Sequence, residues 1–219
     1  MVRGVVRREK PQNYLLVEGK NDFHVICSLL EHYNVPELFS VEDKEGIERL
    51  LEAFEVELIR IEVEKLGVII DSDADLLACW QQLKTILKNS GYHTVPTNPN
   101  LGGAVIKENG LPVVGIWLMP NNKIPGMLED FVSLLVPEND LLWPMADTIL
   151  QQVMQQECRF PQNHRIKAHI HTWLAWQEEP GKPLGQALTA RYLDANSPHA
   201  QELITWIRKL FDLSVNEAI

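Results

Sequence analysis

The chain has 219 residues, of which 45% are hydrophobic and 23% charged, with 12 glycines and 13 prolines. These values are ordinary for a globular protein and exclude disordered, collagen-like and coiled-coil classes. The 30 acidic side chains outnumber the 20 basic ones, so the formal charge is −10. That balance excludes a protein that wraps nucleic acid in a uniformly basic surface.

The cysteines and the first residues predict the compartment. Cys27, Cys79 and Cys158 lie far apart, so they form no Cys-x-x-Cys metal clip or redox pair, and their odd number is typical of a reducing compartment. The first ten residues contain several charges, and no apolar run approaches the roughly 18 residues needed to cross a bilayer. We therefore expect a soluble, cytoplasmic protein without a membrane partner.

Strand and helix patterns alternate along the first part of the chain. The apolar runs 14–17, 39–41 and 66–70 predict strands, and helically spaced apolar residues follow each of them, the first such helix being capped at Asn21. This alternation predicts an α/β fold with a parallel sheet covered by helices. Two further elements complete the domain: a hairpin of residues 104–106 and 113–118 around Asn109-Gly110, and a helix over 127–136.

The composition changes near Pro137. Residues 1–158 contain 24 acidic and 13 basic side chains, whereas residues 159–219 contain 6 acidic and 7 basic ones. Beyond Pro137 the apolar patterns are all helical. We predict an α/β domain over residues 1–137 and a C-terminal helical extension over residues 138–219 that packs on it.

Acidic residues directly follow two of the predicted strands. Glu18 comes after the run 14–17, and Asp71 and Asp73 come after the run 66–70. Because parallel strands end at the same edge of a sheet, these carboxylates converge if the two strands are neighbours. Carboxylates in one small space repel and raise one another's pKa, and a hard divalent cation such as Mg²⁺ or Mn²⁺ relieves that repulsion.

The acidic run 71–75 departs from two familiar Asp-x-Asp motifs. An EF-hand loop requires Gly and Glu where the chain has Leu76 and Gln82, and a haloacid-dehalogenase phosphatase requires Thr or Val in place of Asp75. The sequence also has no Walker loop and no Gly-x-Gly-x-x-Gly loop. Helix capping is an alternative for Asp73 and, more strongly, for Asp75.

The order of these motifs resembles that of the TOPRIM domain of topoisomerases, bacterial primases and the overcoming-lysogenization-defect nucleases. Leu15-Leu-Val-Glu18-Gly19 and Gly67-Val-Ile-Ile-Asp71-Ser-Asp73-Ala-Asp75 carry the resemblance, which covers residues 13–135. The segment Ile124-Pro-Gly126-Met-Leu-Glu129-Asp130 is similar to one in small stand-alone TOPRIM-like proteins. The resemblance implies a sheet of about four parallel strands and Mg²⁺-dependent phosphoryl transfer on nucleic acid.

The resemblance also implies a role for each acid. Glu18 would be the general acid or base, or a ligand, and Asp71 and Asp73 would hold the metal ion, with Asp75 contributing more weakly. Gly19 would let a phosphate approach the following helix, where Lys20 could neutralise it. A solvated surface lysine is the alternative for Lys20, and Lys123 has the same two interpretations.

Three further side chains extend this set. Glu129, and less directly Asp130, would hold a second metal ion, although a solvated first turn of a helix accounts for both acids equally well. Lys167 would be the lysine that such nucleases place near the scissile phosphate. It shares one helical stripe with His164 and His171, and a solvated helix face is the stronger alternative.

These observations predict a Mg²⁺-dependent phosphoryl-transfer protein with a nuclease-like activity. The acidity of residues 1–158 disfavours nucleic acid as a partner. Two alternatives remain open: a non-catalytic metal-binding module within a protein assembly, such as a defence complex, and a phosphohydrolase of small nucleotides. Trp-rich helices after residue 140 are candidates for a homodimer face.

Overall fold

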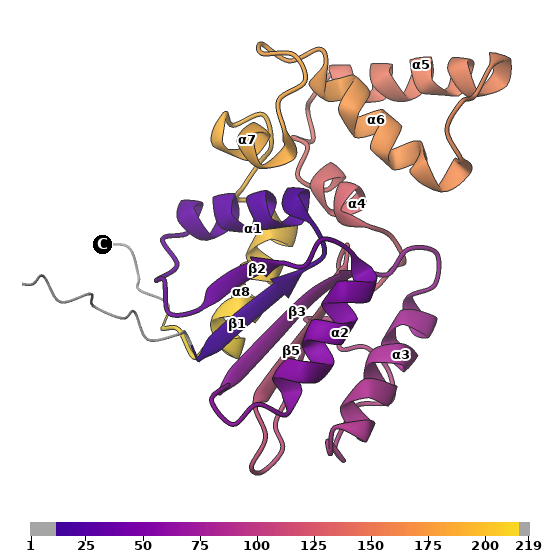
Figure 1. Cartoon of the computed structure of the whole chain (residues 1–219). Helices are drawn as coiled ribbons and strands as arrows, with labels where there is room; N and C mark the ends of the chain where they lie inside the picture. Colours follow the sequence, from indigo (N-terminus) through magenta and orange to yellow (C-terminus); the bar gives the residue numbers. More distant parts are fainter. Residues whose placement is uncertain (1–11, 215–219) are drawn as a thin grey trace, which may run out of the picture.

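A single five-stranded sheet forms the centre of the molecule. The computed structural model describes residues 12–214 (Figure 1). The strands lie in the order β2-β1-β3-β5-β4, in which β1, β2, β3 and β5 are parallel and β4 is antiparallel to β5. Their bounds are β1 Asn13–Val17, β2 Ser40–Asp43, β3 Lys65–Asp71, β4 Ala104–Ile106 and β5 Val113–Met119.

Helices connect and cover these strands. The first four are α1 (Lys20–His32), α2 (Ile47–Leu58), α3 (Leu76–Asn89) and α4 (Leu128–Ser133). The C-terminal part contains α5 (Leu142–Gln156), the short 3₁₀ helix η1 (Gln162–His164), α6 (Arg165–Leu174), α7 (Leu184–Thr189) and α8 (Pro198–Leu210). Within residues 12–214, no helix is both long and apolar enough to span a bilayer.

Two hydrophobic clusters cover the two faces of the sheet. On one face, Leu15 and Val17 of β1 pack with α1, α4 and α8; on the other, Leu16 of β1 packs with α2 and α3. Alternate residues of a strand face opposite sides, which explains this division. The chain crosses from β1 to β2 with α1 on one face and returns to β3 with α2 on the other (Figure 1). The strand order therefore reverses between β1 and β3, where ligands bind in open α/β sheets.

The α/β fold with a mostly parallel sheet and a hairpin is confirmed, because β4 pairs antiparallel with β5 around the turn at Asn109 and Gly110. One helix start differs from the prediction. The N-cap of α1 is Gly19, whereas Asn21 lies inside the first turn. Only Glu18 and Gly19 separate the end of β1 from the start of α1, so the helix begins directly after Gly19.

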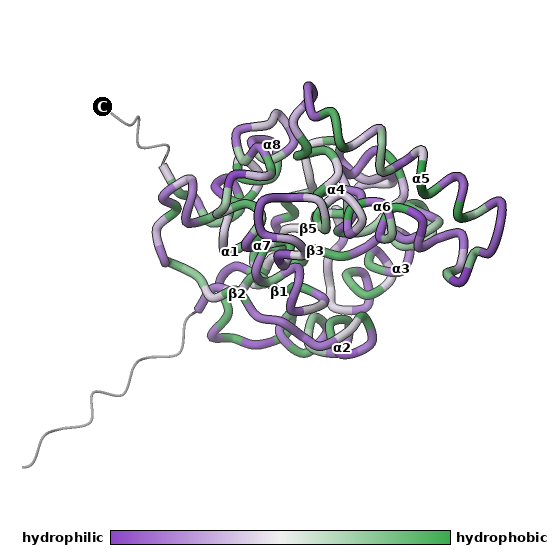
Figure 2. Tube along the Cα trace, turned by 90° about the horizontal axis from the view of Figure 1, so that it is seen from above, coloured by the Kyte–Doolittle hydropathy of each residue, from purple (hydrophilic) through white to green (hydrophobic). Residues whose placement is uncertain are grey.

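The C-terminal helices divide into two groups. α8 lies against β3 and β5, and Trp206 Nε1 donates a hydrogen bond to Ala104 O at 3.0 Å. In contrast, α5 and α6 pack on each other, and α6 also contacts α4. Figure 2 shows α5 at the periphery of the molecule, away from the sheet. The helices after residue 137 therefore contribute both to the core and to a projecting arm.

Candidate functional site

The carboxyl ends of β1 and β3 bring the first two predicted acids together. Val17 pairs with Ile69 in the parallel register, so Glu18 and Asp71 leave the sheet side by side. The Asp71 backbone N–H donates a hydrogen bond to Glu18 Oε1 at 2.6 Å. This bond fixes the Glu18 carboxylate at the strand-order reversal and leaves its second oxygen available.

A cavity of about 490 Å³ opens at this edge. It lies between the end of β3, the first turn of α1, the loop after β2 and the arm helix α6. Its lining residues are Gly19, Lys20, Asn21, Asp22, Asp43, Glu45, Asp71, Leu128, Glu129 and Lys167. The lining thus combines five carboxylates with two lysines, and it includes five of the predicted site residues: Gly19, Lys20, Asp71, Glu129 and Lys167.

Asp71 is the most perturbed group of the cavity. Its Oδ1 atom is buried and has no hydrogen-bond partner within residues 12–214. Burial, followed by the charges of Asp22, Glu18 and Glu129, raises the pKa of Asp71 from 3.8 to about 9. A buried carboxylate in this setting requires a proton or a cation.

Asp22 is a site residue that the sequence motifs do not reveal. It lies in the first turn of α1, is only 8% exposed and lines the cavity. Burial raises the pKa of Asp22 to about 6, and the Glu129 charge adds to the effect. Burial likewise raises the pKa of Glu18 to about 7, with added effects of Asp22 and Asp73. The sequence offers one signal for Asp22, which is its position. An acidic side chain about one helical turn after Gly19 points back toward the end of β1.

Glu129 and Lys167 form an ion pair across the cavity. Lys167 Nζ of α6 lies 3.0 Å from Glu129 Oε1 of α4. The Glu129 side chain is 5% exposed and the Lys167 side chain 48% exposed, so the acid is buried and the lysine reaches it from solvent. The two residues come from opposite sides of the proposed boundary at residue 137.

Backbone hydrogen bonds hold the loop after β3. The N–H groups of Ser72 and Asp73 both donate to Gly126 O, at 2.9 and 3.0 Å, and Ser72 Oγ donates to Met119 O at 2.6 Å. Asp73 has φ +48°, a left-handed conformation that Asp tolerates better than most residues, and its side chain is exposed. Asp71 and Asp73 therefore differ: the first lines the cavity and the second faces solvent near it.

Two predicted metal ligands cap helices instead. Asp75 is the N-cap of α3 and accepts hydrogen bonds from the N–H groups of Leu77 and Ala78, both at 3.0 Å. Asp130 Oδ2 accepts the Met127 N–H at 2.8 Å and so begins α4. Neither acid lines the cavity. The position of Asp75 is thus the one described by the alternative of helix capping, and Asp130 lies in the first turn of α4, as its own alternative describes.

Lys123 lies away from the cavity. Its Nζ is 3.1 Å from Glu202 Oε1 of α8, so this lysine joins the loop after β5 to the C-terminal helix. Lys20, in contrast, is exposed at the cavity rim and follows Gly19. Of the three predicted phosphate-binding residues, Gly19 and Lys20 border the cavity and Lys123 does not.

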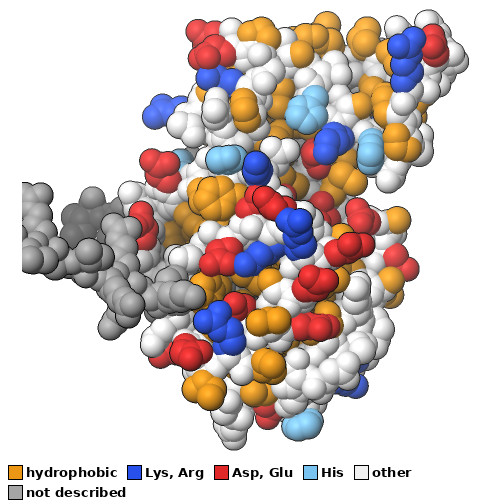
Figure 3. All heavy atoms as spheres, in the orientation of Figure 1, with side chains coloured by type: hydrophobic (Ala, Val, Ile, Leu, Met, Phe, Trp, Pro, Cys, Tyr) orange, Lys and Arg blue, Asp and Glu red, His pale blue; other side chains and the backbone are white. Residues whose placement is uncertain are grey.

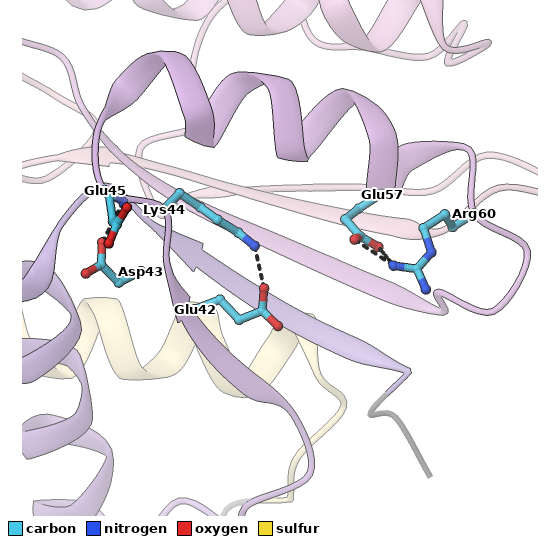
Figure 4. Close-up of polar contacts among 6 residues, drawn as sticks. All are labelled: Glu42, Asp43, Lys44, Glu45, Glu57 and Arg60. Atoms are coloured by element: carbon cyan, nitrogen blue, oxygen red, sulfur yellow. Dashed lines mark hydrogen bonds and ion pairs between the residues drawn. The ribbon is translucent and has the colours of Figure 1, made fainter.

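The loop after β2 adds negative charge to the rim. Asp43 and Glu45 line the cavity, and Asp43 Oδ1 accepts the Glu45 N–H at 2.8 Å. Figure 4 shows Lys44 turned away from both, toward Glu42, with which it forms an ion pair. Arg49 pairs with Glu45. Lys44 therefore does not pair with Asp43. Figure 3 shows acidic and basic side chains side by side on the face of the molecule that it draws.

The donor set fits a hard divalent cation in its chemistry. Asp71 offers a buried oxygen that has no partner in the part of the chain that the structure describes. Glu18 and Asp22 offer neighbouring carboxylates whose pKa values are raised mainly by burial. Mg²⁺ and Mn²⁺ prefer such oxygen ligands. Within residues 12–214, however, no three His, Cys, Asp or Glu side chains already converge on one point. The acids surround the cavity instead of meeting at its centre.

A comparison with protein-family models identifies the family of the chain. A family model described as "Protein of unknown function (DUF3226)" covers residues 12–212. The chain belongs to this family. No curated protein and no solved structure matches it significantly. The DUF3226 match spans both the sheet and the C-terminal helices, so Lys167 of α6 belongs to the same family region as Glu18 and Asp71.

Proposed function

We propose that this protein binds Mg²⁺ or Mn²⁺ at the carboxyl ends of β1 and β3 and catalyses phosphoryl transfer, as a TOPRIM-like domain does. The observation that carries the proposal is the buried Oδ1 of Asp71, which has no hydrogen-bond partner among the described residues and lies among carboxylates beside Glu18. The strand order supports it, because β1 and β3 are neighbours at the reversal point of the sheet.

The cation ligands in this proposal are Asp71, the free oxygen of Glu18, and Asp22, with Glu129 as a further acid. When bound, a divalent cation would polarise the phosphoryl group and promote ionisation of a water molecule. Asp73 is exposed and lies two residues after Asp71. In this proposal it binds the cation through a water molecule or after a rotation of its side chain. Asp75 and Asp130 are left out of this set because they cap helices.

The two lysines of the cavity receive the phosphate in this proposal. Lys20 lies at the rim beside Gly19, and Lys167 reaches in from α6. A phosphate that enters between them exchanges the Glu129 contact of Lys167 for one with a phosphate oxygen, while the α1 N-terminus adds its dipole. In the alternative role of general base, Glu18 does not hold the cation, and its free oxygen accepts a proton from water while the Asp71 N–H fixes the other oxygen.

Nucleic acid is the substrate class that the TOPRIM resemblance favours, and a small nucleotide is the second candidate. The cavity volume of about 490 Å³ lies within the range of small-molecule sites, and its rim carries Asp43 and Glu45. A long polyanion meets these acids, whereas a single phosphate group between Lys20 and Lys167 does not. This observation favours a short substrate or a nucleic-acid end.

Cation binding and turnover are tested separately. Mn²⁺ binding, followed by calorimetry, should be lost in Asp71→Asn and retained in Asp75→Asn, a matched variant at the neighbouring helix cap. Plasmid, single-stranded DNA, RNA and nucleoside triphosphates are then incubated with Mg²⁺ or Mn²⁺. Turnover that disappears in Asp71→Asn and Glu18→Gln supports the enzyme. Binding without turnover of any substrate supports the non-catalytic module, and equal binding by Asp71→Asn refutes the site.

A further inference from the structure

An exposed ridge of apolar side chains runs along α5. Leu141, Met145, Ile149 and Val153 follow one another at intervals of four residues and are 81%, 56%, 45% and 43% exposed. Residues four apart lie on one side of a helix and form a continuous ridge. These four residues are called the α5 ridge below.

The rest of α5 already has its partner. Its buried residues are Ala146 and Leu150, and its main helix contacts are with α6. Met145 and Ile149 of the α5 ridge precede the buried Ala146 and Leu150 by one position, so the ridge lies about 100° around the helix from them. Figures 1 and 2 show α5 at the periphery of the molecule. A helix with a single apolar stripe buries it against its own domain. α5 carries a second one, which is exposed and needs another partner.

The α5 ridge is free of charge in an acidic chain. The one charged residue of Leu142–Gln156 is Asp147, which pairs with Arg165 of α6. The side chains beside the ridge include Thr148, Gln152 and Gln156. With a formal charge of −10, two copies repel each other where acidic surfaces meet. The α5 ridge allows two copies to approach without that repulsion.

We propose that two copies of this chain associate through the α5 ridge as a two-fold symmetric dimer with antiparallel α5 helices. A two-fold axis near Asp147 brings Met145 of one copy against Ile149 of the other, so each pair joins a flexible side chain to a branched one. Antiparallel pairing also places the two acidic α/β bodies at opposite ends of the helix pair. A parallel pair would bring them together.

The expected dimer is weak and reversible. One helix pair with ridges four residues apart crosses at about −50°, so the contact is confined to the middle of the α5 ridge and is smaller than the roughly 1,000 Å² of a typical specific interface. The contact is hydrophobic and the opposing force is charge repulsion. Added salt should therefore strengthen the dimer by screening the repulsion, whereas a dimer held by ion pairs would weaken.

Sedimentation velocity of the full chain over a wide concentration range tests the proposal. Wild-type protein should shift from monomer to dimer as concentration rises. Met145→Glu with Ile149→Glu should raise the dissociation constant more than about a hundredfold, because two carboxylates per copy would have to lose water in the contact. Both positions are exposed in the monomer, so the thermal unfolding midpoint should stay near that of the wild type.

A matched double variant separates the ridge from general surface hydrophobicity. Val56 and Ile59, near the end of α2, are 57% and 68% exposed. Val56→Glu with Ile59→Glu should dimerise like the wild type. A monomeric wild type at all concentrations, or dimers in the Met145→Glu, Ile149→Glu variant, would overturn the proposal. Loss of the dimer in the α2 control would overturn it as well.

Oxidative cross-linking tests the antiparallel arrangement. Cys158 is exposed just beyond α5, so the variants are made in a Cys158→Ser background. A mixture of Met145→Cys and Ile149→Cys proteins should give the mixed disulfide in higher yield than either homodisulfide. Predominant homodisulfides would overturn the antiparallel contact. Metal binding by these variants should equal that of the wild type, because the α5 ridge is separate from the cavity.

Discussion

Burial affects the charge of Asp71 more strongly than any neighbouring side chain does. It is the largest of the causes that raise the pKa of this carboxyl to about 9, ahead of the acids around it. The same balance applies to Glu18 and Asp22, whose pKa values rise to about 7 and 6. Ionising these carboxyl groups in the cavity therefore costs free energy, and binding a proton or a cation lowers that cost.

This cost predicts how stability depends on pH in the metal-free protein. The pKa of Asp71 is 3.8 in an exposed state and about 9 when folded, so unfolding releases a proton between these values. The contribution of Asp71 is therefore fully present below pH 3.8 and is lost as pH rises through about 9. Asp71→Asn removes this titration. We expect the free energy of unfolding of the variant to exceed that of the wild type by about 1–3 kcal/mol near pH 8, and the two values to converge near pH 4.

Urea unfolding with a chelator present measures this difference. Asp75→Asn serves as the control, because asparagine also caps helices, so the free energy of unfolding should change by less than about 1 kcal/mol at both pH values. If Asp71→Asn instead lowers the free energy of unfolding equally at both pH values, the contacts of Asp71 stabilise the fold, and burial does not disfavour its ionised form.

The Glu129–Lys167 ion pair gives a second prediction. Lys167→Met leaves Glu129 buried without its cation, and we expect a loss of about 1–2 kcal/mol in unfolding free energy, moderated by the exposure of the lysine. Glu129→Gln in the same background should recover most of the loss, because no buried charge remains. Chemical denaturation of the two single variants and the double variant gives the coupling free energy between Glu129 and Lys167. If the two substitutions have additive effects on the free energy of unfolding, the ion pair contributes little to stability.

At the scale of elements, α7 packs closely against α1. A Cβ atom on Gly185 would lie 2.8 Å from the backbone C and O atoms of His24. Ser28 Oγ also donates to Gly185 O at 3.0 Å. The two helices therefore approach closely because residue 185 has no side chain.

Gly185→Ala should consequently destabilise the protein although it lies in a helix. Intrinsic helix propensity favours Ala over Gly by up to about 1 kcal/mol, but overpacking against backbone costs about 1–3 kcal/mol and cannot be relieved by a side-chain rotation. Gly102→Ala is the control, since its Cβ meets no atom nearer than 3.9 Å. Thermal unfolding of both variants compares them, and a Gly185→Ala protein as stable as the wild type would mean that α7 moves freely.

The elements themselves are largely predictable because local patterns determine them. A short apolar run indicates β1, and a short run rich in β-branched residues indicates β3. At the start of α8, Ser197 accepts the Ala200 N–H at 3.2 Å, as expected for a serine that is followed by a proline at the first helical position. The turn at Asn109 and Gly110 is predictable for the same reason. In each case the signal and the structure lie within a few residues of each other.

The site is less predictable because contacts between distant residues assemble it. Spacing places Glu18 and Asp71 at strand ends, but no local pattern states that β1 and β3 are neighbours. In the sequence, Asp22 is an ordinary first-turn acid, and only its burial distinguishes it. Lys167 has the pattern of a surface lysine, and its contact with Glu129 depends on how α6 lies on α4.

At the scale of the whole molecule, acidity restricts how a polyanion can bind. The formal charge is −10, and the cavity offers only Lys20 and Lys167 as cations among its lining residues. Counterion release from nucleic acid scales with the number of phosphates that a protein neutralises. A chain with this charge distribution should therefore contact one or two phosphates and depend on a divalent ion to do so.

The salt dependence of oligonucleotide binding tests this restriction. With two lysines in contact with a single strand, the slope of log K against log salt should be about −1.4, and Lys20→Met should reduce its magnitude by about 0.7. A chelator should abolish binding, because the carboxylates of the cavity then repel the phosphate. Fluorescence anisotropy with a labelled single strand in Mn²⁺ measures both effects, and Lys123→Met, which removes a lysine paired with Glu202, is the control. A slope steeper than about −5, or binding that persists in chelator, would mean that a basic surface elsewhere on the chain holds the nucleic acid.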